Sequence, residues 1–326
     1  MPRAIQPVCY CRPGLSGTTA GKYKLSITDS TATGTRTGLV VASYGQRGIL
    51  EADGAHVPYI LKGRRLKTVC GDRVSWTAGP DGPVVTAVAP RDNALDRPDH
   101  RGKTETLAAN LDQLAVVLAP EPTPDFFLAD RFLCAGELAG THTLLIWNKT
   151  DLNMPEPAAL DEYRALGYPV IKVAALASGG CDALNAALHT GISILVGQSG
   201  VGKSALINGL VANADVLTGE LSTGSGEGRH TTTASYMHAT RAGGYLVDSP
   251  GVREFAPFIH DDRSVQSGFR DIVSRADRCR FADCQHTREP DCAVKQAVQA
   301  GELSERRYAS YKRLLNMTAA VHEGRH

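Results

Sequence analysis

The sequence at residues 197–204 reads G-Q-S-G-V-G-K-S, and it directly follows the apolar run at 192–196. It matches G-x-x-x-x-G-K-[ST], the phosphate-binding loop that joins a buried strand to a helix. Glycines are needed there because backbone N–H groups must close around phosphate oxygens without interference from side chains. The stretch therefore predicts a P-loop domain with a doubly wound α/β fold. An ordinary glycine-rich turn before a helix is the alternative.

Each residue of this loop has an expected place around a nucleoside triphosphate. Lys203 would reach the β and γ phosphates, and Ser204 would give its hydroxyl to Mg²⁺. Lys203 is for this reason also counted as a catalytic residue. The phosphate-binding residues predicted from the sequence are Gly197, Gln198, Ser199, Gly200, Val201, Gly202, Lys203 and Ser204.

A second motif, N-K-T-D at 148–151, follows a buried strand expected at 143–147. At the end of a strand, N-K-x-D is the guanine-reading signature of GTPases. The carboxylate of Asp151 would accept hydrogen bonds from guanine N1–H and the 2-amino group, whereas adenine would leave it unpaired at a cost of about 1 to 3 kcal/mol. A helix-capping turn is the alternative. The predicted guanine-binding residues are Asn148, Lys149, Thr150, Asp151 and the backbone N–H of Ala175.

Two further stretches would contact the γ-phosphate. In D-S-P-G at 248–251, Asp248 would hold Mg²⁺ through water, and the N–H of Gly251 would meet the γ-phosphate. The glycine-rich stretch at 219–233 ends in G-R-H-T-T-T, where a threonine could close on Mg²⁺ and the γ-phosphate. A threonine-rich strand start is the alternative. The sequence does not decide which of Thr231, Thr232 and Thr233 is the ligand.

The order of these motifs along the chain is unusual. Ordinary GTPases run from the phosphate loop through the switch threonine and D-x-x-G to N-K-x-D, but here N-K-T-D comes before the phosphate loop. A doubly wound sheet requires only that the same strand ends meet at one crevice, whatever their chain order. We therefore expect a circularly permuted GTPase domain at residues 93–258.

The chain before this domain has a different pattern. Residues 1–33 are rich in Ser, Thr and Gly and predict a disordered extension. Five short β-rich runs between turn signals at 34–92 predict an antiparallel, OB-like barrel that binds RNA. Phosphate contacts would come from Arg64, Arg65 and Lys67. Tyr44, Tyr59 and Trp76 could stack on bases or belong to the barrel core. The charged segment 91–103, which holds Pro98, predicts a linker.

After the GTPase domain, residues 259–326 contain C-x4-C-x-H-x5-C. Three thiolates and an imidazole make a closed tetrahedral Zn²⁺ site, and the short spacings suit a loop between helices. A redox-active or merely buried cysteine set is the alternative. The predicted zinc ligands are Cys279, Cys284, His286 and Cys292. A last helix carries Arg306, Arg307, Lys312 and Arg313 beside Tyr308 and Tyr311, which pack or stack on RNA.

Composition limits the class of protein. The chain has 326 residues, of which 42% are hydrophobic, and its net charge is +1. That charge hides basic ends around an acidic centre, as expected if the ends meet a polyanion; charged solvated faces are the alternative. Without a long apolar run or a secretory signal, we expect a monomeric cytoplasmic protein that is not in a membrane.

The combination of barrel, permuted GTPase domain and metal module resembles the ribosome-small-subunit-dependent GTPase A family, also called RsgA, YjeQ or YloQ. The resemblance covers residues 36–315, and it includes P-R-D-N-A-L-D-R-P at 90–98, A-A-N-L-D-Q at 108–113 and D-S-P-G-V-R-E-F at 248–255. N-K-T-D, G-Q-S-G-V-G-K-S, G-R-H-T-T-T and the metal cluster add to it. The chain departs from the family in its N-terminal extension and in Ala174, where a serine is usual.

The resemblance implies a factor that binds the small (30S) ribosomal subunit late in its maturation and hydrolyses GTP when docked on rRNA. Val252 follows D-x-x-G where many GTPases have a water-orienting Gln, so another residue must position the attacking water. His230 is the candidate, and a structural histidine is the alternative. Two other functions stay open: an RNA-binding module that nucleotide only stiffens, and a P-loop kinase or ATPase that prefers ATP.

Overall fold

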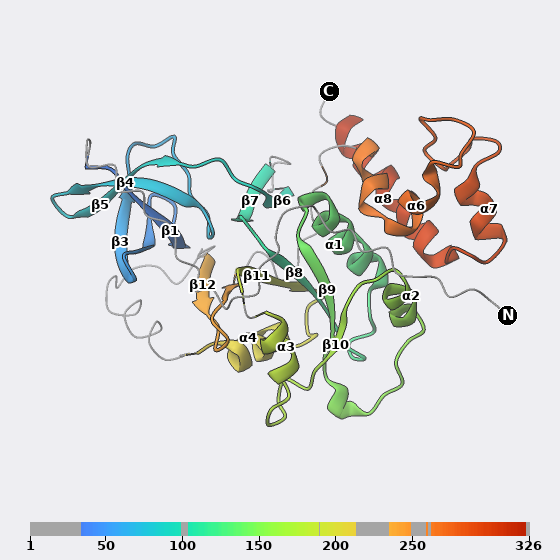
Figure 1. Cartoon of the computed structure of the whole chain (residues 1–326), viewed down its shortest axis with the longest axis horizontal. Helices are drawn as coiled ribbons and strands as arrows, with labels where there is room; N and C mark the ends of the chain where they lie inside the picture. The colour runs from blue at the N-terminus through green and yellow to red at the C-terminus, as the bar shows by residue number, and fades with distance from the viewer. Residues whose placement is uncertain are drawn as a thin grey trace, which may run out of the picture.

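The computed structural model describes residues 34–98, 104–188, 190–212, 235–248, 259 and 262–323. Within these ranges the chain forms three parts in a row, with a β-barrel at one end, an α/β domain in the centre and a helical module at the other end (Figure 1). The expected disordered extension at 1–33 lies outside the described residues. No helix that the structure describes is both long and apolar enough to cross a bilayer.

The barrel has the five strands expected from the sequence. They are β1 (Arg36–Ser43), β2 (Arg47–Ala52), β3 (Ala55–Leu61), β4 (Arg73–Gly79) and β5 (Gly82–Val88). Pairing of β1 with both β2 and β4 closes the sheet, and β3 adds a short parallel pairing with β5. Its interior is apolar, with Val40, Leu50 and Val85 fully buried. Alternating inward and outward residues in β2 and β4 produce this core.

Residues 94–98 of the segment expected to be a charged linker are instead one strand of a hairpin. Strand β6 (Ala94–Pro98) pairs antiparallel with β7 (Thr104–Ala109). Leu95 and Leu107 are buried in the core of the central domain. Thus the linker prediction was wrong for this part, because two inward leucines on short strands outweigh the charges on the outward side.

The central domain is built on parallel strands. The strands are β8 (Gln113–Leu118), β9 (His142–Trp147), β10 (Val170–Lys172), β11 (Ile192–Gly197), β12 (Ser235–Ala239) and β13 (Tyr245–Asp248). Their spatial order is β10-β9-β8-β11-β13-β12, and all but β12 run parallel to their neighbours. The parallel strands therefore end at one common edge.

Helices cover both faces of this sheet, as the doubly wound prediction requires. Helices α1 (Phe126–Ala139) and α2 (Ala159–Ala165) pack on one face, and α3 (Asp182–Ala187) and α4 (Lys203–Leu210) pack on the other. Alternate residues of one strand face opposite layers: Leu114 and Val116 lie in the first core, and Ala115 and Val117 lie in the second. Burial on both faces explains why these strands are continuous apolar runs.

The barrel and the central domain share one sheet. Barrel strand β1 pairs antiparallel with β12, which joins the two sets of strands into a single sheet of 11 strands. Tyr245 on β13 also donates a hydrogen bond of 2.5 Å to Glu51 on β2. Leu39 and Val41 of the barrel belong to the same buried cluster as the central strands. The barrel is therefore packed firmly on the central domain.

The C-terminal module is helical. It consists of a 3-10 helix η3 (Asp262–Gly268), α6 (Arg270–Ala276), α7 (Ala293–Gln299) and the long α8 (Glu305–Glu323). Its own core includes Phe269, Ile272 and Leu314, and Cys134 of α1 is buried in the same cluster. The module therefore packs directly against α1 of the central domain (Figure 1).

Candidate functional site: a nucleotide pocket and a metal centre

The nucleotide motifs lie where neighbouring parallel strands end. Asn148 follows β9, Gly197 ends β11, and Asp248 ends β13, while β8 lies between β9 and β11. In open α/β sheets, ligands bind in the crevice outside the carboxyl ends of the strands. The fold thus brings together motifs that the sequence presents in reversed order.

The phosphate loop curves around the end of the Lys203 side chain. The Nζ atom of this buried lysine donates hydrogen bonds of 2.7 Å to the carbonyls of both Gly197 and Gln198. Gly197 has φ 141°, and a Cβ there would come within 2.3 Å of the Val117 carbonyl oxygen. Glycine is therefore required at the start of the loop by its close approach to β8, in addition to any ligand.

Asn148 joins the base-reading motif to the phosphate loop. Its side chain is buried, and its Nδ2 donates a hydrogen bond of 2.9 Å to the carbonyl of Val201. A Cβ on Gly202, which has φ 95°, would come within 2.4 Å of this Nδ2. Asn148, predicted from the sequence to bind guanine, thus braces the phosphate loop in this structure. The two motifs are held side by side by a direct contact.

The rest of N-K-T-D is anchored to the end of β10. The backbone N–H and the hydroxyl of Thr150 both donate to the Val173 carbonyl at 3.1 Å. Asp151 follows in a single turn of 3-10 helix, η1 (Thr150–Leu152), and its side chain is exposed. The N–H of Ala175, predicted to meet guanine, donates to Asn148 Oδ1 at 3.2 Å. In this structure Ala175 thus orients Asn148.

A short loop that we did not predict to belong to the site contacts both motifs. Lys149 Nζ donates a hydrogen bond of 2.8 Å to the Glu121 carbonyl, and the Asp125 N–H donates to Gln198 Oε1 at 3.2 Å. These residues lie between β8 and α1, in the proline-containing run E-P-T-P-D. Their contacts use backbone groups of the loop, so no side-chain pattern in the sequence pointed to them.

The two predicted Mg²⁺ ligands, Asp248 and Ser204, lie in the described part of the chain. Asp248 is half-buried at the end of β13, and Ser204 is exposed in the first turn of α4. Because β11 and β13 are adjacent parallel strands, both residues lie at the same edge of the sheet. The other residues predicted for the γ-phosphate and the attacking water fall outside the described residues; they are His230, Thr231, Thr232, Thr233 and Gly251. Val252, at the place of the usual glutamine, lies outside them as well.

The four predicted zinc ligands converge in the C-terminal module. Their ligand atoms lie within 4.8 Å of one another. Nδ1 of His286 is 3.4 Å from Sγ of both Cys279 and Cys292, and those two sulfur atoms are 3.9 Å apart. Tetrahedral zinc with ordinary bond lengths would require about 3.5 Å between sulfur and nitrogen and about 3.8 Å between sulfurs. The Cys₃His cluster is consistent with zinc.

The surroundings of this cluster suit a closed metal site. Burial lowers the pKa of His286, which favours the neutral imidazole that can ligate a metal. Burial also raises the pKa of the Cys284 thiol to about 12, so a cation is needed to hold it as thiolate. Tyr308 and Tyr311 on α8 donate hydrogen bonds of 2.6 and 2.9 Å to the carbonyls of His286 and Gln285. These tyrosines pack on the metal loop, which confirms the packing alternative.

The basic side chains assigned to RNA differ in exposure. Arg64, Arg65 and Lys67 are exposed on the barrel, as the prediction requires. In contrast, Tyr59 and Trp76 are core residues with 2% and 6% exposure, so neither offers a face for base stacking. A small barrel needs large aromatic rings to fill its core, and for this reason both rings are buried and not exposed on the surface.

Two arginines of α8 are not on the surface either. Arg307 is 1% exposed, and Arg306 is largely covered; both form ion pairs with Asp130 of α1, at 2.7 and 2.9 Å. The exposed basic residues of this helix are Lys312 and Arg313. Arg313 also stacks over the ring of Phe127 on α1, 3.9 Å from its centroid, so three of the four predicted basic residues contact the central domain.

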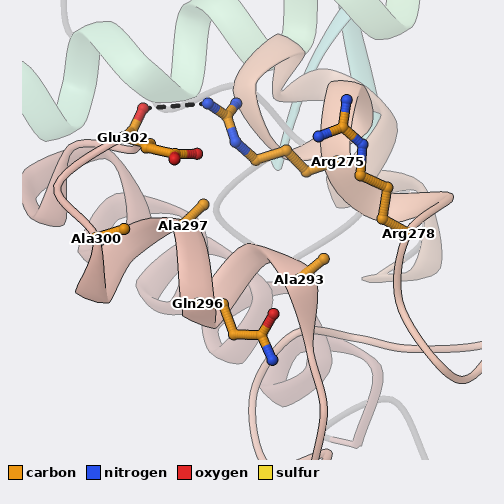
Figure 2. Close-up of a pocket in the computed structure, with 7 residues that line it drawn as sticks. All are labelled: Arg275, Arg278, Ala293, Gln296, Ala297, Ala300 and Glu302. Carbon is orange, nitrogen blue, oxygen red and sulfur yellow. Dashed lines mark hydrogen bonds between the residues drawn. The ribbon is translucent and has the colours of Figure 1, made fainter.

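A pocket of about 300 Å³ lies in the C-terminal module, away from the nucleotide motifs (Figure 2). Arg275 is fixed at its rim by a hydrogen bond of 3.1 Å to the Glu302 carbonyl. Its lining consists of Arg275, Arg278, Ala293, Gln296, Ala297, Ala300 and Glu302. At the phosphate loop, by comparison, the ammonium group of Lys203 is hydrogen-bonded to the carbonyls of Gly197 and Gln198 inside the loop.

A phosphate loop after β11 and an N-K-T-D motif after β9, at the same edge of one sheet and in permuted chain order, define this protein as a circularly permuted GTPase. Comparisons with known proteins agree. A sequence model of the RsgA GTPase family matches residues 88–257. The chain is 42% identical over 287 residues to "Small ribosomal subunit biogenesis GTPase RsgA" of Pseudomonas aeruginosa (strain LESB58), covering 86% of this chain and 85% of that protein.

Solved structures show the same architecture. The crystal structure of YjeQ from Thermotoga maritima matches with a TM-score of 0.67 and 30% identity over 87% of this chain and 99% of that chain. The structure of YloQ, described as a circularly permuted GTPase, matches with a TM-score of 0.64 and 25% identity over 88% and 96% of the two chains. This chain belongs to the RsgA GTPase family, whose members are GTP hydrolases.

Proposed function

We propose that this protein binds the small (30S) ribosomal subunit late in its maturation and hydrolyses GTP to GDP and phosphate while it is docked on rRNA. The observation that carries the proposal is the hydrogen bond of 2.9 Å from Asn148 to the Val201 carbonyl, because the N-K-T-D motif and the G-Q-S-G-V-G-K-S loop are in direct contact there. Similar proteins are named small ribosomal subunit biogenesis GTPase, and this name supports the small subunit as the partner.

The proposed nucleotide contacts follow from the positions of the two motifs. Asp151 reads guanine N1–H and the 2-amino group, and the stem of Lys149 covers the base. Ala175 reaches the guanine carbonyl only if its N–H leaves Asn148, so we propose that its first role is to orient Asn148. Backbone N–H groups of residues 197–204 surround the phosphates, and Lys203 neutralises the charge on the β and γ phosphates.

Magnesium would be held by two groups at the same edge of the sheet. Ser204 lies in the first turn of α4, which follows β11, and Asp248 ends the adjacent parallel strand β13. A hydroxyl and a carboxylate are oxygen ligands that suit Mg²⁺, which keeps several waters. The cation would neutralise charge between the phosphates, while the threonines at 231–233 and the N–H of Gly251 complete the γ-phosphate contacts.

The three parts would have separate tasks. We propose that the barrel at 34–92 and the zinc module at 259–326 hold rRNA, and that the domain at 93–258 binds GTP. The exposed Arg64, Arg65 and Lys67 support the first assignment, because clustered cations on one surface attract phosphate backbones. In this scheme the protein acts as a cytoplasmic monomer, in the compartment where its ribosomal partner is assembled.

His230 is our candidate for positioning the attacking water, because Val252 occupies the place of the usual glutamine and cannot do so. We expect small subunits to raise the GTP turnover of the wild-type protein. The His230→Ala variant should lose about 10²-fold or more of the stimulated rate, because a positioned histidine contributes at least that much. Both rates are measured by phosphate release with and without purified small subunits.

His142→Ala is the matched control, since His142 is an exposed histidine at the start of β9. Equal stimulated rates for His230→Ala and the wild type would remove His230 from the mechanism. RNA binding without any stimulation of the wild-type rate would instead favour an RNA-binding module in which nucleotide has only a structural role.

The Cys₃His cluster is proposed to hold one structural Zn²⁺. The Cys292→Ser variant should lose most of its bound zinc, because a neutral hydroxyl replaces a thiolate in a closed four-ligand site. We also expect the C-terminal module to lose its packed structure, since metal binding and folding are coupled in such sites. Zinc content is measured by elemental mass spectrometry, and the packing of the module by near-ultraviolet circular dichroism.

The Cys181→Ser variant serves as the control for this experiment, because Cys181 is a buried cysteine of the central domain, outside the cluster. It should bind as much zinc as the wild-type protein. Wild-type protein purified without zinc or any other transition metal, or Cys292→Ser with an unchanged zinc content, would show that the cluster is not a zinc site.

A further inference from the structure

Helix α1 begins at the nucleotide motifs. Its N-cap residue is Asp125, whose side chain accepts a hydrogen bond of 2.9 Å from the Leu128 N–H. The N–H of the same Asp125 donates to Gln198 in the phosphate loop, at 3.2 Å. Four residues earlier, the Glu121 carbonyl accepts the hydrogen bond from Lys149 of the base-reading motif. The N-cap of this helix and the loop that leads into it thus contact both nucleotide motifs.

The body of the same helix is bound by the zinc module. Asp130 is 1% exposed, and its carboxylate accepts from Arg307 Nη1 at 2.7 Å and from Arg306 Nη1 at 2.9 Å, both on α8. The Tyr163 hydroxyl of α2 donates to the same carboxylate at 2.6 Å. A buried carboxylate of the central domain is therefore held by two arginines of another part of the protein.

Arg307 also binds a carboxylate of its own module. Its Nε and Nη2 donate to the two oxygens of Asp271 on α6, each at 3.0 Å. The nearby negative charges of Asp130 and Asp271 outweigh burial and raise the pKa of Arg307, so it stays charged. One buried guanidinium thus joins α1 to α6. Because the planar guanidinium is hydrogen-bonded to a carboxylate on each side, the distance between these helices can change little.

A second link lies further along α1. Arg270, the first residue of α6, donates to Glu137 at 3.0 Å and to the carbonyl of Leu166 at 3.1 Å. The guanidinium also stacks over the ring of Tyr168, 3.9 Å from its centroid. The zinc module therefore holds α1 at two places on one side of the helix.

Along α1 the path between the two contact regions is short. Asp125 and Asp130 are five residues apart, which corresponds to about 8 Å along a helix axis. A helix is stiff over that length. A shift in the position of Asp130 against the zinc module therefore also displaces the N-terminus of the helix. The hydrogen bonds to Gln198 and Lys149 would be displaced with it.

We propose that the zinc module positions the nucleotide pocket through α1, and that Arg307, paired with Asp130 and Asp271, is the positioning residue. The inference rests on the proposed roles of Lys149 and Gln198 in nucleotide binding. It supplies a connection from the C-terminal module to the pocket that uses only described residues. Because coupling between sites is reciprocal, GDP binding must also stabilise the packing of the zinc module on α1.

The first test is a variant in which the ion pairs are replaced without leaving a buried charge. Arg307→Ala alone would leave two buried carboxylates unpaired and would endanger folding. The triple variant Arg307→Gln, Asp130→Asn, Asp271→Asn is uncharged at all three positions and can still form hydrogen bonds. We expect its affinity for a fluorescent GDP analogue to be lower by about fivefold or more, the usual range for coupled sites. Its zinc content should match that of the wild-type protein.

The matched control is the double variant Arg280→Gln, Asp291→Asn. This is also an arginine–aspartate ion pair, with 3.0 Å between Arg280 Nη1 and the Asp291 carboxylate, but both side chains are exposed, at 64% and 63%. It belongs to the zinc module, and among the described residues it forms no hydrogen bond or ion pair with α1. The control should bind GDP as tightly as the wild-type protein.

The second test needs no substitution. Amide hydrogen exchange of the wild-type protein is measured with and without GDP; α6 and α8 should exchange more slowly with GDP, and this protection should be lost in the triple variant. A folded, zinc-loaded triple variant with wild-type affinity for GDP would overturn the proposal. So would protection of residues 198–204 by GDP without protection of α6 and α8 in the wild type. If GDP did not protect residues 198–204, the assignment of the pocket itself would fail.

Discussion

The Lys203→Ala variant is expected to hydrolyse GTP about 10²–10³-fold more slowly than the wild-type protein in the presence of small ribosomal subunits. Lys203 is buried at the centre of the phosphate loop, where its ammonium group is 2.7 Å from two carbonyl oxygens of the loop. Phosphoryl transfer places negative charge on the phosphate oxygens, and catalysis depends on cations that are already in position to stabilise it. No other lysine lies in the motif.

The measurement compares steady-state phosphate release by wild type, Lys203→Ala and the control Lys172→Ala. Lys172 ends β10, lies 59% exposed and pairs with Glu156 on the surface, so its removal should leave the rate unchanged. Circular dichroism shows whether the variants are folded. Lys203→Ala with wild-type turnover would mean that the triphosphate is bound elsewhere.

The Asp151→Asn variant should exchange guanine for xanthine as the preferred base. The amide presents one acceptor and one donor where the carboxylate presented two acceptors. Its oxygen can still accept from N1–H, but its NH₂ group faces the 2-amino donor of guanine, whereas xanthine offers a carbonyl oxygen at position 2. A site built for a specific hydrogen-bond pattern rejects the wrong pattern strongly. We expect the ratio of GTP to xanthosine triphosphate affinities to change by about 10²-fold or more.

Competition of the two triphosphates against a fluorescent nucleotide gives this ratio directly. Asp161→Asn is the control, because Asp161 is an aspartate of the same domain with an 80% exposed side chain that pairs only with Arg164 in the described structure. It should keep the wild-type preference. A variant at position 151 that still prefers GTP would show that another group reads the base.

Local patterns predicted where the nucleotide motifs lie in the fold. A glycine-rich loop after a buried strand and N-K-T-D after another each have a geometry set by a few consecutive residues, and the structure has both at strand ends. The zinc cluster was also predictable, because its ligands occur within one short segment and their spacing decides their convergence. The fold class followed from the same motifs, since continuous apolar runs before them indicate parallel strands.

Long-range contacts were beyond such patterns. Arg307 and Asp130 are 177 residues apart in the chain, and a charged residue on a predicted helix face is normally expected in solvent. Likewise, nothing in β1 or β12 indicates that the barrel and the central domain share a sheet, because edge pairing depends on where the two parts meet. The β6–β7 hairpin was missed because its outward residues are charged and its buried apolar residues are few; the large ones are Leu95 and Leu107.

Membership of the RsgA GTPase family decides between the functions that the sequence alone left open. A kinase or ATPase would not need the N-K-T-D motif that Asn148 holds against the phosphate loop. The order of the motifs along the chain is not important for this contact. In the sheet only β8 lies between β9 and β11, so the ends of these two strands are close whichever comes first in the sequence.

A structure determined with GDP and Mg²⁺ tests most directly whether the two motifs form a single nucleotide pocket. The Asp151 carboxylate should lie about 2.7–3.2 Å from guanine N1 and the 2-amino group, while Lys203 Nζ contacts the β-phosphate of the same molecule. A bound GDP whose base lies away from Asp151, or whose phosphates lie outside residues 197–204, would contradict a guanine-specific pocket formed by these two motifs.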